Sequence, residues 1–209
     1  DHMHAPIAMA AMQLGKHVYV EKPLTRTLHE TRMLTEYAAQ NKVITQMGNQ
    51  LASGSGNKAT AKAIADGLIG KIVSVQSMCP KSWGSMKPLP DREDPIPDSL
   101  DWEQWIGVAK MRSYIKGEFH PGQWRKRIGY GTGTLGDMAC HIVHPWVKGL
   151  GAPVPVSVKS VGPAPVDGDS WPLDGQVEYM MGGNDLTAGD FPYVWYDGKN
   201  IPGDEIAAH

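Results

Sequence analysis

Residues 15–23, with the sequence GKHVYVEKP, decide the fold that we expect for this chain. The β-branched and aromatic run over residues 17–20 predicts a short strand, and a glycine and a proline bound it at either end. The apolar residues that precede this run have the i, i+3, i+4, i+7 spacing of one helix face: Ile7, Ala10, Ala11 and Leu14. The chain is therefore predicted to begin with a helix that leads directly into a strand.

A second helix and a second strand are predicted in the same order. Thr27 and Glu30 form a capping-box pattern, which marks the start of a helix, and residues 43–47 (VITQM) predict a strand closed by Gly48. Strands that alternate with helices favour a parallel sheet covered by helices. Two strands do not make a stable open sheet, and the sequence begins at a loop-to-helix junction without a Met. We therefore expect it to be a fragment, or an incompletely determined sequence.

From residue 57 onward the pattern changes to a mixture of helices, strands and irregular segments. Residues 80–100 contain five prolines and predict a long surface loop. Helices are predicted over residues 59–68, 102–106 and 135–148. Strands are predicted over residues 71–78, 154–161, 175–181 and 191–196.

The composition excludes several classes of protein. Among the 209 residues, 41% are hydrophobic and 20% are charged, which is ordinary for a globular chain. The formal net charge is −2 without a basic stripe, which argues against nucleic acid, and no apolar run approaches the ~20 residues of a membrane span. Two cysteines, Cys79 and Cys140, give no disulfide framework. Seven Trp and seven Tyr fit either a site for polar organic ligands or an aromatic core.

Three groups of residues are candidates for chemistry. The first is Glu21-Lys22-Pro23, at the carboxyl end of a predicted parallel strand, where open α/β sheets bind ligands. A lysine there can donate a hydrogen bond to a substrate hydroxyl or carbonyl, and the proline can adopt a cis bond that fixes the turn. The alternative is a solvated lysine at a strand end.

The second group lies on the predicted helix over residues 135–148. Asp137 and His141 are one turn apart, and His144 and Lys148 extend the same face. A carboxylate beside an imidazole suits proton abstraction from an alcohol. Two alternatives stay open: a buried structural Asp–His pair, and a metal site made by Asp137, His141 and His144, which lacks a clear further ligand and the usual zinc spacing.

The third group is Trp124-Arg125, an adjacent indole and guanidinium that could stack on a ring and bind hydroxyls or phosphate. The Gly-rich stretch at residues 131–133 follows no clear strand and lacks the rest of a phosphate-loop fingerprint. It is not counted as a phosphate site.

Taken in order, these segments resemble the Gfo/Idh/MocA oxidoreductases, the glucose–fructose oxidoreductase and inositol dehydrogenase family. Residues 1–24 are similar to the family's passage from its fourth Rossmann strand to its EKP motif. Residues 133–141, GTLGDMACH, are similar to the catalytic helix of its second domain. Residues 101–107 (DWEQWIG) and Trp124-Arg125 resemble its sugar-active, bacterial branches. The resemblance covers most of residues 1–160.

The resemblance implies an α/β fold in two domains. Residues 1–50 would be the C-terminal part of a Rossmann dinucleotide-binding domain. Residues 51–209 would be an α+β domain for substrate binding and oligomerisation, with a large, mostly antiparallel open sheet. The implied cofactor is NAD or NADP, and the implied assembly is a homo-oligomer, a dimer or tetramer. The family's Gly-rich βαβ unit, from which NAD or NADP preference is read, does not occur in this sequence.

The resemblance also implies the site residues. His141 would take the proton from a sugar hydroxyl while hydride passes to nicotinamide, and Lys22 would hydrogen-bond the reacting oxygen. Asp137 would orient the sugar or the imidazole. No metal is implied, and His144 stands where many relatives carry an acidic residue. The cofactor would lie beside His4, Glu21, Lys22, Pro23, Gln46, Trp124 and Arg125.

Three functions are consistent with these residues. The first is an NAD(P)-dependent oxidoreductase acting on a sugar, cyclitol or related polyol. The second is an NAD-dependent glycosidase of the same fold that oxidises a sugar transiently, and the third is a non-catalytic oligomeric binding protein. The expected partner is a small carbohydrate or polyol, not nucleic acid or a membrane. The cysteines fit the reducing cytoplasm, but an export signal would precede Asp1, so a periplasmic location stays open.

Overall fold

The computed structural model describes residues 1–203, and packing divides the chain into two compact units. Unit 1 contains Asp1–Gly48, Trp83–Gly133 and Pro165–Trp171. Unit 2 contains Asn49–Ser82, Thr134–Ala164 and the chain from Pro172 onward. The chain passes between the units several times, so the units are not the two continuous segments, 1–50 and 51–209, that the family resemblance implies. That division into family domains stays a prediction.

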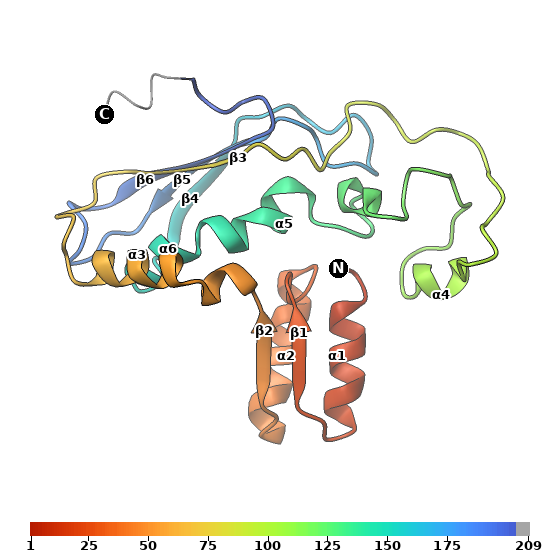
Figure 1. Ribbon diagram of the computed structural model, residues 1–209, viewed down its shortest axis with the longest axis horizontal. Coiled ribbons are helices and arrows are strands. Elements are labelled where there is room, and N and C mark those ends of the chain that lie inside the picture. Colours follow the sequence, from red (N-terminus) through yellow and green to blue (C-terminus); the bar gives the residue numbers. More distant parts are fainter. Residues whose placement is uncertain (204–209) are drawn as a thin grey trace. The chain divides into compact units, whose positions relative to one another are not determined.

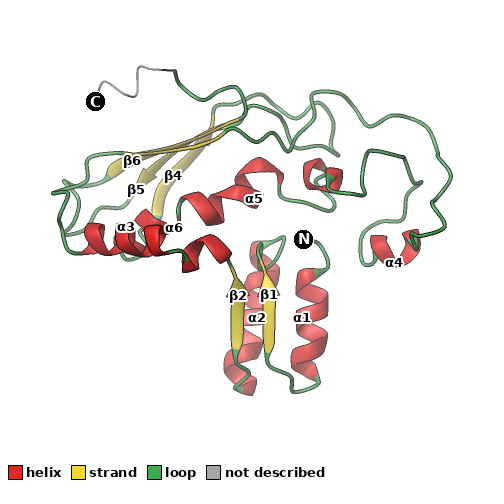
Figure 2. Cartoon of the chain, viewed as in Figure 1, coloured by secondary structure: helices red, strands yellow, loops and turns green. Residues whose placement is uncertain are grey.

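The first part of unit 1 has the predicted order of helix, strand, helix and strand (Figures 1 and 2). Helix α1 (His4–Gln13) precedes strand β1 (Val18–Glu21), and helix α2 (Leu28–Asn41) precedes strand β2 (Thr45–Gly48). The two strands are parallel, with Val18 opposite Thr45 at one end and Glu21 opposite Gly48 at the other. The carboxyl ends of β1 and β2 therefore meet at one edge. The buried residues of this part are Ala5, Ala8, Met12 and Leu34.

The start of α2 confirms the capping box. The Glu30 backbone N–H donates to the Thr27 hydroxyl, and the Glu30 carboxylate accepts from the Thr27 backbone N–H at 2.9 Å. Two N–H groups that a helix start leaves unsatisfied are paired in this way. The helix start also fixes where the loop that follows β1 ends.

The second part of unit 1 is built around aromatic side chains. Helix α4 (Trp102–Ile106) begins at its Asp101 cap and places Trp102 against Trp105, with ring centroids 4.9 Å apart. The short 3₁₀ helix η2 (Gln123–Lys126) follows, and residues 80–100 form the predicted irregular loop. Here the abundant aromatic residues do serve as a core. The buried members are Trp102, Ile106, Tyr114, Ile115, Phe119 and Tyr130.

Unit 2 contains a four-stranded sheet with the order β3-β6-β5-β4. Its strands are β3 (Val75–Cys79), β4 (Pro155–Ser160), β5 (Gln176–Met181) and β6 (Phe191–Asp197). Only β3 and β6 pair in parallel, while β4 with β5 and β5 with β6 are antiparallel. The expectation of a mostly antiparallel sheet is therefore confirmed.

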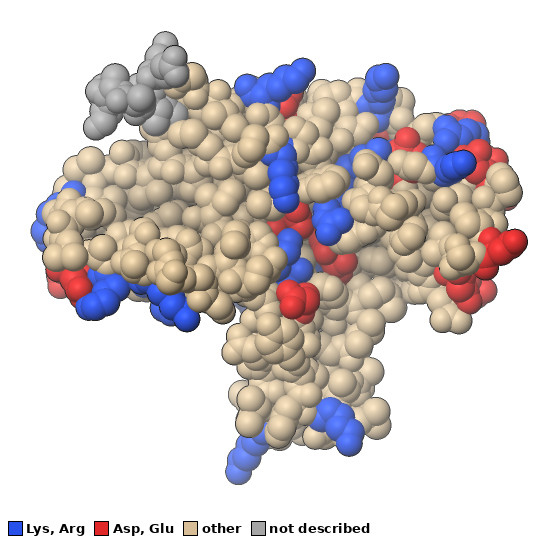
Figure 3. Space-filling model, viewed as in Figure 1, with Lys and Arg blue, Asp and Glu red and all other residues tan. Residues whose placement is uncertain are grey.

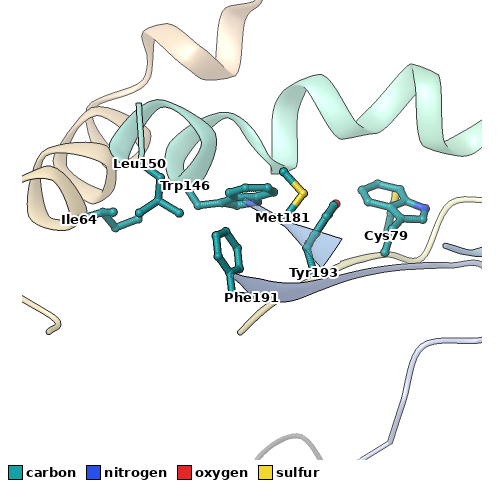
Figure 4. Close-up of a cluster of buried hydrophobic side chains, with 8 residues drawn as sticks. Ile64, Cys79, Trp146, Leu150, Met181, Phe191 and Tyr193 are labelled. Carbon is teal, nitrogen blue, oxygen red and sulfur yellow. The ribbon is translucent and has the colours of Figure 1, made fainter. Parts of the chain in front are cut away.

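Helices cover one face of this sheet (Figure 1). They are α3 (Ser55–Ala65), which follows the 3₁₀ turn η1 (Gln50–Ser53), α5 (Gly133–Ile142) and α6 (His144–Gly149). In the core between them, Trp146 of α6 meets Tyr193 of β6 with ring centroids 4.7 Å apart (Figure 4). Burial raises the pKa of Tyr193 to about 12, which keeps its hydroxyl neutral in this core.

The single helix expected over residues 135–148 is wrong, because the chain forms two helices there. Helix α5 ends at Ile142, and α6 begins at His144 with Pro145 in its first turn. A proline has no backbone N–H, and its ring clashes with the carbonyl of the residue four positions earlier, here His141. A helix therefore cannot continue through Pro145 undisturbed, and His144 and Lys148 belong to a different helix from Asp137.

In the part of the chain that the structure describes, no helix combines the length and the apolar character that a membrane crossing requires. Acidic and basic side chains lie scattered among other residues on the face drawn in Figure 3.

Candidate functional site

The carboxyl end of the parallel pair in unit 1 positions Glu21 and Lys22. The Lys22 backbone N–H donates to the Gly48 carbonyl at 3.0 Å, so the lysine begins the loop directly at the sheet edge. Gly48 lies under the Glu21 carboxylate, and a Cβ on Gly48 would lie 2.6 Å from Glu21 Oε1. Glycine at position 48 thus leaves space for the carboxylate at the edge where open α/β sheets bind ligands.

The loop that follows Lys22 is tied to its surroundings by two hydrogen bonds within unit 1. The Lys22–Pro23 peptide bond is cis, and the Pro23 carbonyl accepts from His4 Nδ1 at 2.6 Å. Arg26 Nη1 donates to the Ile128 carbonyl at 2.7 Å. His4, the first residue of α1, and Pro23 are therefore brought together, as are the loop and the segment after η2.

Gln46 lies apart from this end of the strands. It stands opposite Tyr19 within the parallel pair, is exposed, and donates from Nε2 to the Met47 carbonyl at 2.7 Å. The structure therefore places Gln46 two residues before the carboxyl end of β2.

Trp124 and Arg125 lie in η2, with the Arg125 guanidinium stacked on two indoles. Its central carbon is 4.4 Å from the Trp124 ring centroid and 5.3 Å from that of Trp83. Cation–π stacking holds a planar guanidinium in one orientation. Sequence reasoning missed Trp83, because it lies about 40 residues earlier, at the start of the long loop, with no local pattern to mark it.

A tight backbone contact supports this stack. A Cβ on Gly131 would lie 2.6 Å from Arg125 Cα, and the Trp171 indole N–H donates to the Gly131 carbonyl at 3.0 Å. The Gly131 segment therefore packs directly against the backbone that carries the guanidinium.

A buried ion pair fixes the same segment from the other side. Lys126 lies 2.9 Å from the Glu118 carboxylate, and Arg127, which is 1% exposed, also donates to it. Burial alone raises the pKa of Glu118, but the hydrogen bonds from Lys126 and Arg127 outweigh burial and hold that pKa below its ordinary value. Glu118 is therefore ionised at neutral pH and carries the negative charge that pairs with Lys126 and Arg127.

In unit 2, helix α5 carries both residues of the predicted Asp–His group. Asp137 is 4% exposed and His141 is 6% exposed, one turn apart on the same helix. His141 Nδ1 lies 2.8 Å from Asn49 Oδ1, and Asn49 Nδ2 donates to the Cys140 carbonyl at 2.7 Å. Sequence reasoning missed Asn49, whose only signal is a polar residue directly after a strand.

The structure does not show the alternative metal site made by Asp137, His141 and His144. His144 belongs to α6 and not to the helix face of Asp137 and His141. Among residues 1–203, the structure shows no group of three or more His, Cys, Asp and Glu side chains that could hold a metal ion.

The predicted site residues thus fall into two sets, one in each unit. His4, Glu21, Lys22 and Pro23 cluster at the carboxyl end of β1, and Trp124 and Arg125 form the indole stack. Asp137 and His141 are buried on α5 in unit 2. Their joint role in a reaction stays a prediction.

Two curated proteins are similar in sequence to this chain. Levoglucosan dehydrogenase from Pseudarthrobacter phenanthrenivorans is 27% identical over 143 residues, which are 68% of this chain and 29% of that protein. 1,5-anhydro-D-fructose reductase from Ensifer adhaerens is 32% identical over 76 residues, 36% of this chain and 23% of that protein. These matches span about a quarter to a third of the curated relatives.

Solved structures share the fold. GenD2 from gentamicin A biosynthesis, in complex with NAD, aligns with a TM-score of 0.60 at 20% identity and covers 97% of this chain and 46% of that one. Levoglucosan dehydrogenase in complex with NADH and L-sorbose aligns with a TM-score of 0.58 at 22% identity over 97% and 46% of the two chains. This chain spans about half the length of these structures.

Two family matches agree with the resemblance seen in the sequence. Residues 1–49 match the oxidoreductase family described by its NAD-binding Rossmann fold, and residues 54–171 match the same family's C-terminal alpha/beta domain. The second match alone covers more than half of the chain, and the first supplies the segment before it. This chain therefore belongs to the Gfo/Idh/MocA oxidoreductase family.

Proposed function

We propose that the protein is an NAD(P)-dependent oxidoreductase that transfers a hydride between a sugar or polyol and nicotinamide. The observation that carries this proposal is the buried Asp137–His141 pair on α5, inside the segment that matches the family. The names of the two curated relatives refer to levoglucosan and 1,5-anhydro-D-fructose, which supports a carbohydrate substrate.

The residues at the carboxyl end of β1 fit the nicotinamide half of the cofactor. This edge is where open α/β sheets bind dinucleotides, and Gly48 keeps it free of a side chain from β2. The hydrogen bonds of His4 Nδ1 and of the Lys22 backbone N–H hold the loop at this edge. In this proposal the Lys22 ammonium and the Nε2 side of His4 are the polar groups that suit a carboxamide and ribose hydroxyls. When bound, the cofactor supplies the acceptor or donor of the hydride.

The chain's own residues handle the proton and the developing charge. As the C–H hydride leaves the substrate carbon, its hydroxyl loses a proton and a C=O bond forms. We assign the proton to His141, because an imidazole can both accept and return a proton near neutral pH. Lys22 donates a hydrogen bond to the oxygen that becomes more negative, and Asp137 orients the sugar or the imidazole.

The stacked Arg125 has a further role in this proposal. Its guanidinium carbon lies within 5.3 Å of both the Trp124 and the Trp83 ring centroids, and we assign to this guanidinium the binding of sugar hydroxyls or a cofactor phosphate.

We also propose a homo-oligomer, dimer or tetramer, which the exposed strand β4 with Val156 and Val158 supports. Light scattering checks this, and a monomer at micromolar concentration would contradict it.

The experiment measures reduced nicotinamide formed from NAD⁺ or NADP⁺ with D-glucose, levoglucosan and myo-inositol. We expect Lys22→Met and His141→Ala each to lower kcat/KM on the order of 100-fold or more. If both residues act on one oxygen, the double variant loses less than the product of the single losses. The matched controls are exposed residues of the same types, Lys16→Met and His29→Ala.

Three outcomes would contradict the proposal. Unchanged turnover of a confirmed substrate in His141→Ala would remove the proposed base. Cleavage of a glycoside without accumulation of reduced nicotinamide would favour the NAD-dependent glycosidase. A wild-type protein that binds sugars and converts none of them would favour the non-catalytic binding protein.

A further inference from the structure

Asn49, a residue outside the predicted site, makes two hydrogen bonds to neighbouring residues of α5. It directly follows β2 and has extended backbone angles at the residue before η1, where its side chain makes no capping hydrogen bond. Its Nδ2 donates to the Cys140 carbonyl at 2.7 Å, and its Oδ1 lies 2.8 Å from His141 Nδ1. One half-buried amide thus contacts both the backbone and the imidazole of α5 in unit 2.

The Cys140 carbonyl decides which way this amide points. A backbone carbonyl only accepts hydrogen bonds, so the amide nitrogen must face it. The opposite orientation would bring two acceptor oxygens to 2.7 Å of each other. The amide oxygen therefore faces His141, and since that oxygen is also only an acceptor, His141 Nδ1 must carry the proton.

We infer that Asn49 is a positioning residue that holds neutral His141 in the tautomer with the proton on Nδ1. In a neutral imidazole one nitrogen carries the proton and the other carries the lone pair. The lone pair is then on Nε2, the nitrogen that receives the proton of the substrate hydroxyl. The tautomer follows from the contacts alone, while the identity of the proton donor rests on the proposed function.

An amide is suited to this position for an electrostatic reason. A carboxylate at the same place would fix the same tautomer, but its charge would favour the protonated imidazole. Asp137 already places one carboxyl group a single turn from His141 on α5. An uncharged acceptor at Nδ1 orients the ring without adding a second negative charge, so the proton can be taken up and returned as the reaction runs in either direction. The hydrogen bond to Cys140, among the last four carbonyls of α5, fixes the amide in turn.

The first test reads the tautomer directly. Protein labelled with ¹⁵N-histidine gives imidazole nitrogen shifts that differ between the two tautomers, and His141→Gln identifies the signal. We expect the proton on Nδ1 in the wild type and in Asn49→Asp, which keeps the acceptor. In Asn49→Leu, which removes both polar groups at similar size, we expect a shift toward the form with the proton on Nε2.

A matched control separates this effect from the loss of any side-chain amide. Asn57 donates from Nδ2 to the Leu51 carbonyl at 2.8 Å in the same unit. Asn57→Leu should leave the His141 tautomer unchanged. A wild-type His141 with its proton on Nε2, or an unchanged tautomer in Asn49→Leu, would overturn the inference.

The second test is kinetic. In Asn49→Leu we expect kcat to fall on the order of 100-fold with little change in KM. Asn49→Asp keeps the acceptor toward His141 but loses the hydrogen bond to the Cys140 carbonyl, so it should retain more of kcat than Asn49→Leu and less than the wild type. In Asn49→Asp the acid side of the plot of kcat against pH should move to higher pH, because the added negative charge favours the protonated His141 imidazole. A rise in KM alone, or an equal loss in Asn57→Leu, would contradict a positioning role.

The tautomer measurement needs no turnover, so the two proposals fail separately. A wild-type protein with the proton on Nδ1 that oxidises none of the tested sugars supports the positioning role of Asn49 and overturns the proposed function.

Discussion

At the scale of single residues, the stacked guanidinium depends on a glycine that makes room for it. Arg125 lies over Trp124 and Trp83, and its backbone packs directly against Gly131. A side chain on Gly131 would meet Arg125 backbone atoms, which cannot rotate away as the tip of a flexible side chain can. The geometry of the arginine is thus determined by its neighbours in space more than by its own sequence position.

We therefore expect Gly131→Ala to lower the free energy of unfolding by about 1–3 kcal/mol, the usual cost of forcing extra volume into a packed site. Denaturant unfolding followed by tryptophan fluorescence measures this change. Gly129→Ala is the matched control, because a Cβ there meets no atom within 4 Å. Equal stability of the two variants would show that the Gly131 contact does not constrain the Arg125 segment.

At the scale of elements, local patterns predicted the first fifty residues well. The strand run, the apolar helix spacing and the Thr27–Glu30 capping box each act over a few residues and are visible in sequence. The sequence did not predict the break before α6, because apolar residues continue past Pro145 with helical spacing. That spacing was given more weight than the proline, which lacks the N–H that a continuous helix needs.

Contacts between distant residues could not be predicted in this way. The place of β3 in the strand order β3-β6-β5-β4 depends on its pairing with β6, which lies more than a hundred residues later in the chain. Asn49 and His141 are 92 positions apart, and no periodicity connects them. The residues of the candidate site were therefore predicted where the family resemblance covered them, and a supporting side chain outside the resembling motifs was missed.

Helices α3 and α6 approach each other closely at Gly149. A Cβ on Gly149 of α6 would lie 2.7 Å from Ile64 Cβ and 2.9 Å from the Ala61 carbonyl oxygen. We expect Gly149→Ala to lower the free energy of unfolding by about 1–3 kcal/mol. Gly56→Ala in α3 meets nothing within 4 Å and should raise stability by about 0.5–1 kcal/mol through helix propensity. Chemical denaturation compares them, and a stabilising Gly149→Ala would contradict the close packing.

At the scale of the whole molecule, each unit has a core of its own. Unit 1 combines the buried side chains around α1 and α2 with an aromatic cluster, and unit 2 has the core between its sheet and helices. Unit 1 also contains the buried Arg127, which donates to Glu118 and lies 3.6 Å from the Asp169 carboxylate. This ion pair makes the stability of the molecule depend on pH in a definite direction.

The pKa of Glu118 in the folded protein is lowered, so the folded state binds fewer protons at this group than the unfolded state. Its contribution is complete above the ordinary glutamate pKa and is lost as pH falls below that value through the lowered one. We expect Glu118→Gln to be less stable than wild type by about 2 kcal/mol at neutral pH, with the difference shrinking in acid.

Denaturant unfolding from neutral pH to below the ordinary glutamate pKa measures this change. The exposed Glu103→Gln serves as the control and should follow the wild-type pH dependence. A difference between Glu118→Gln and wild type that stays constant across this range would show that the carboxylate is not what the buried arginine requires.

The most direct test of the proposed function follows a hydrogen atom from sugar to cofactor. D-glucose, levoglucosan and myo-inositol deuterated on carbon are incubated with NAD⁺ or NADP⁺, and mass spectrometry detects deuterium in the reduced nicotinamide. Hydride transfer predicts deuterium in the nicotinamide with wild-type protein and Lys16→Met, and a strong loss of label with Lys22→Met and His141→Ala. Reduced nicotinamide that carries no deuterium, or label that is undiminished in His141→Ala, would contradict it.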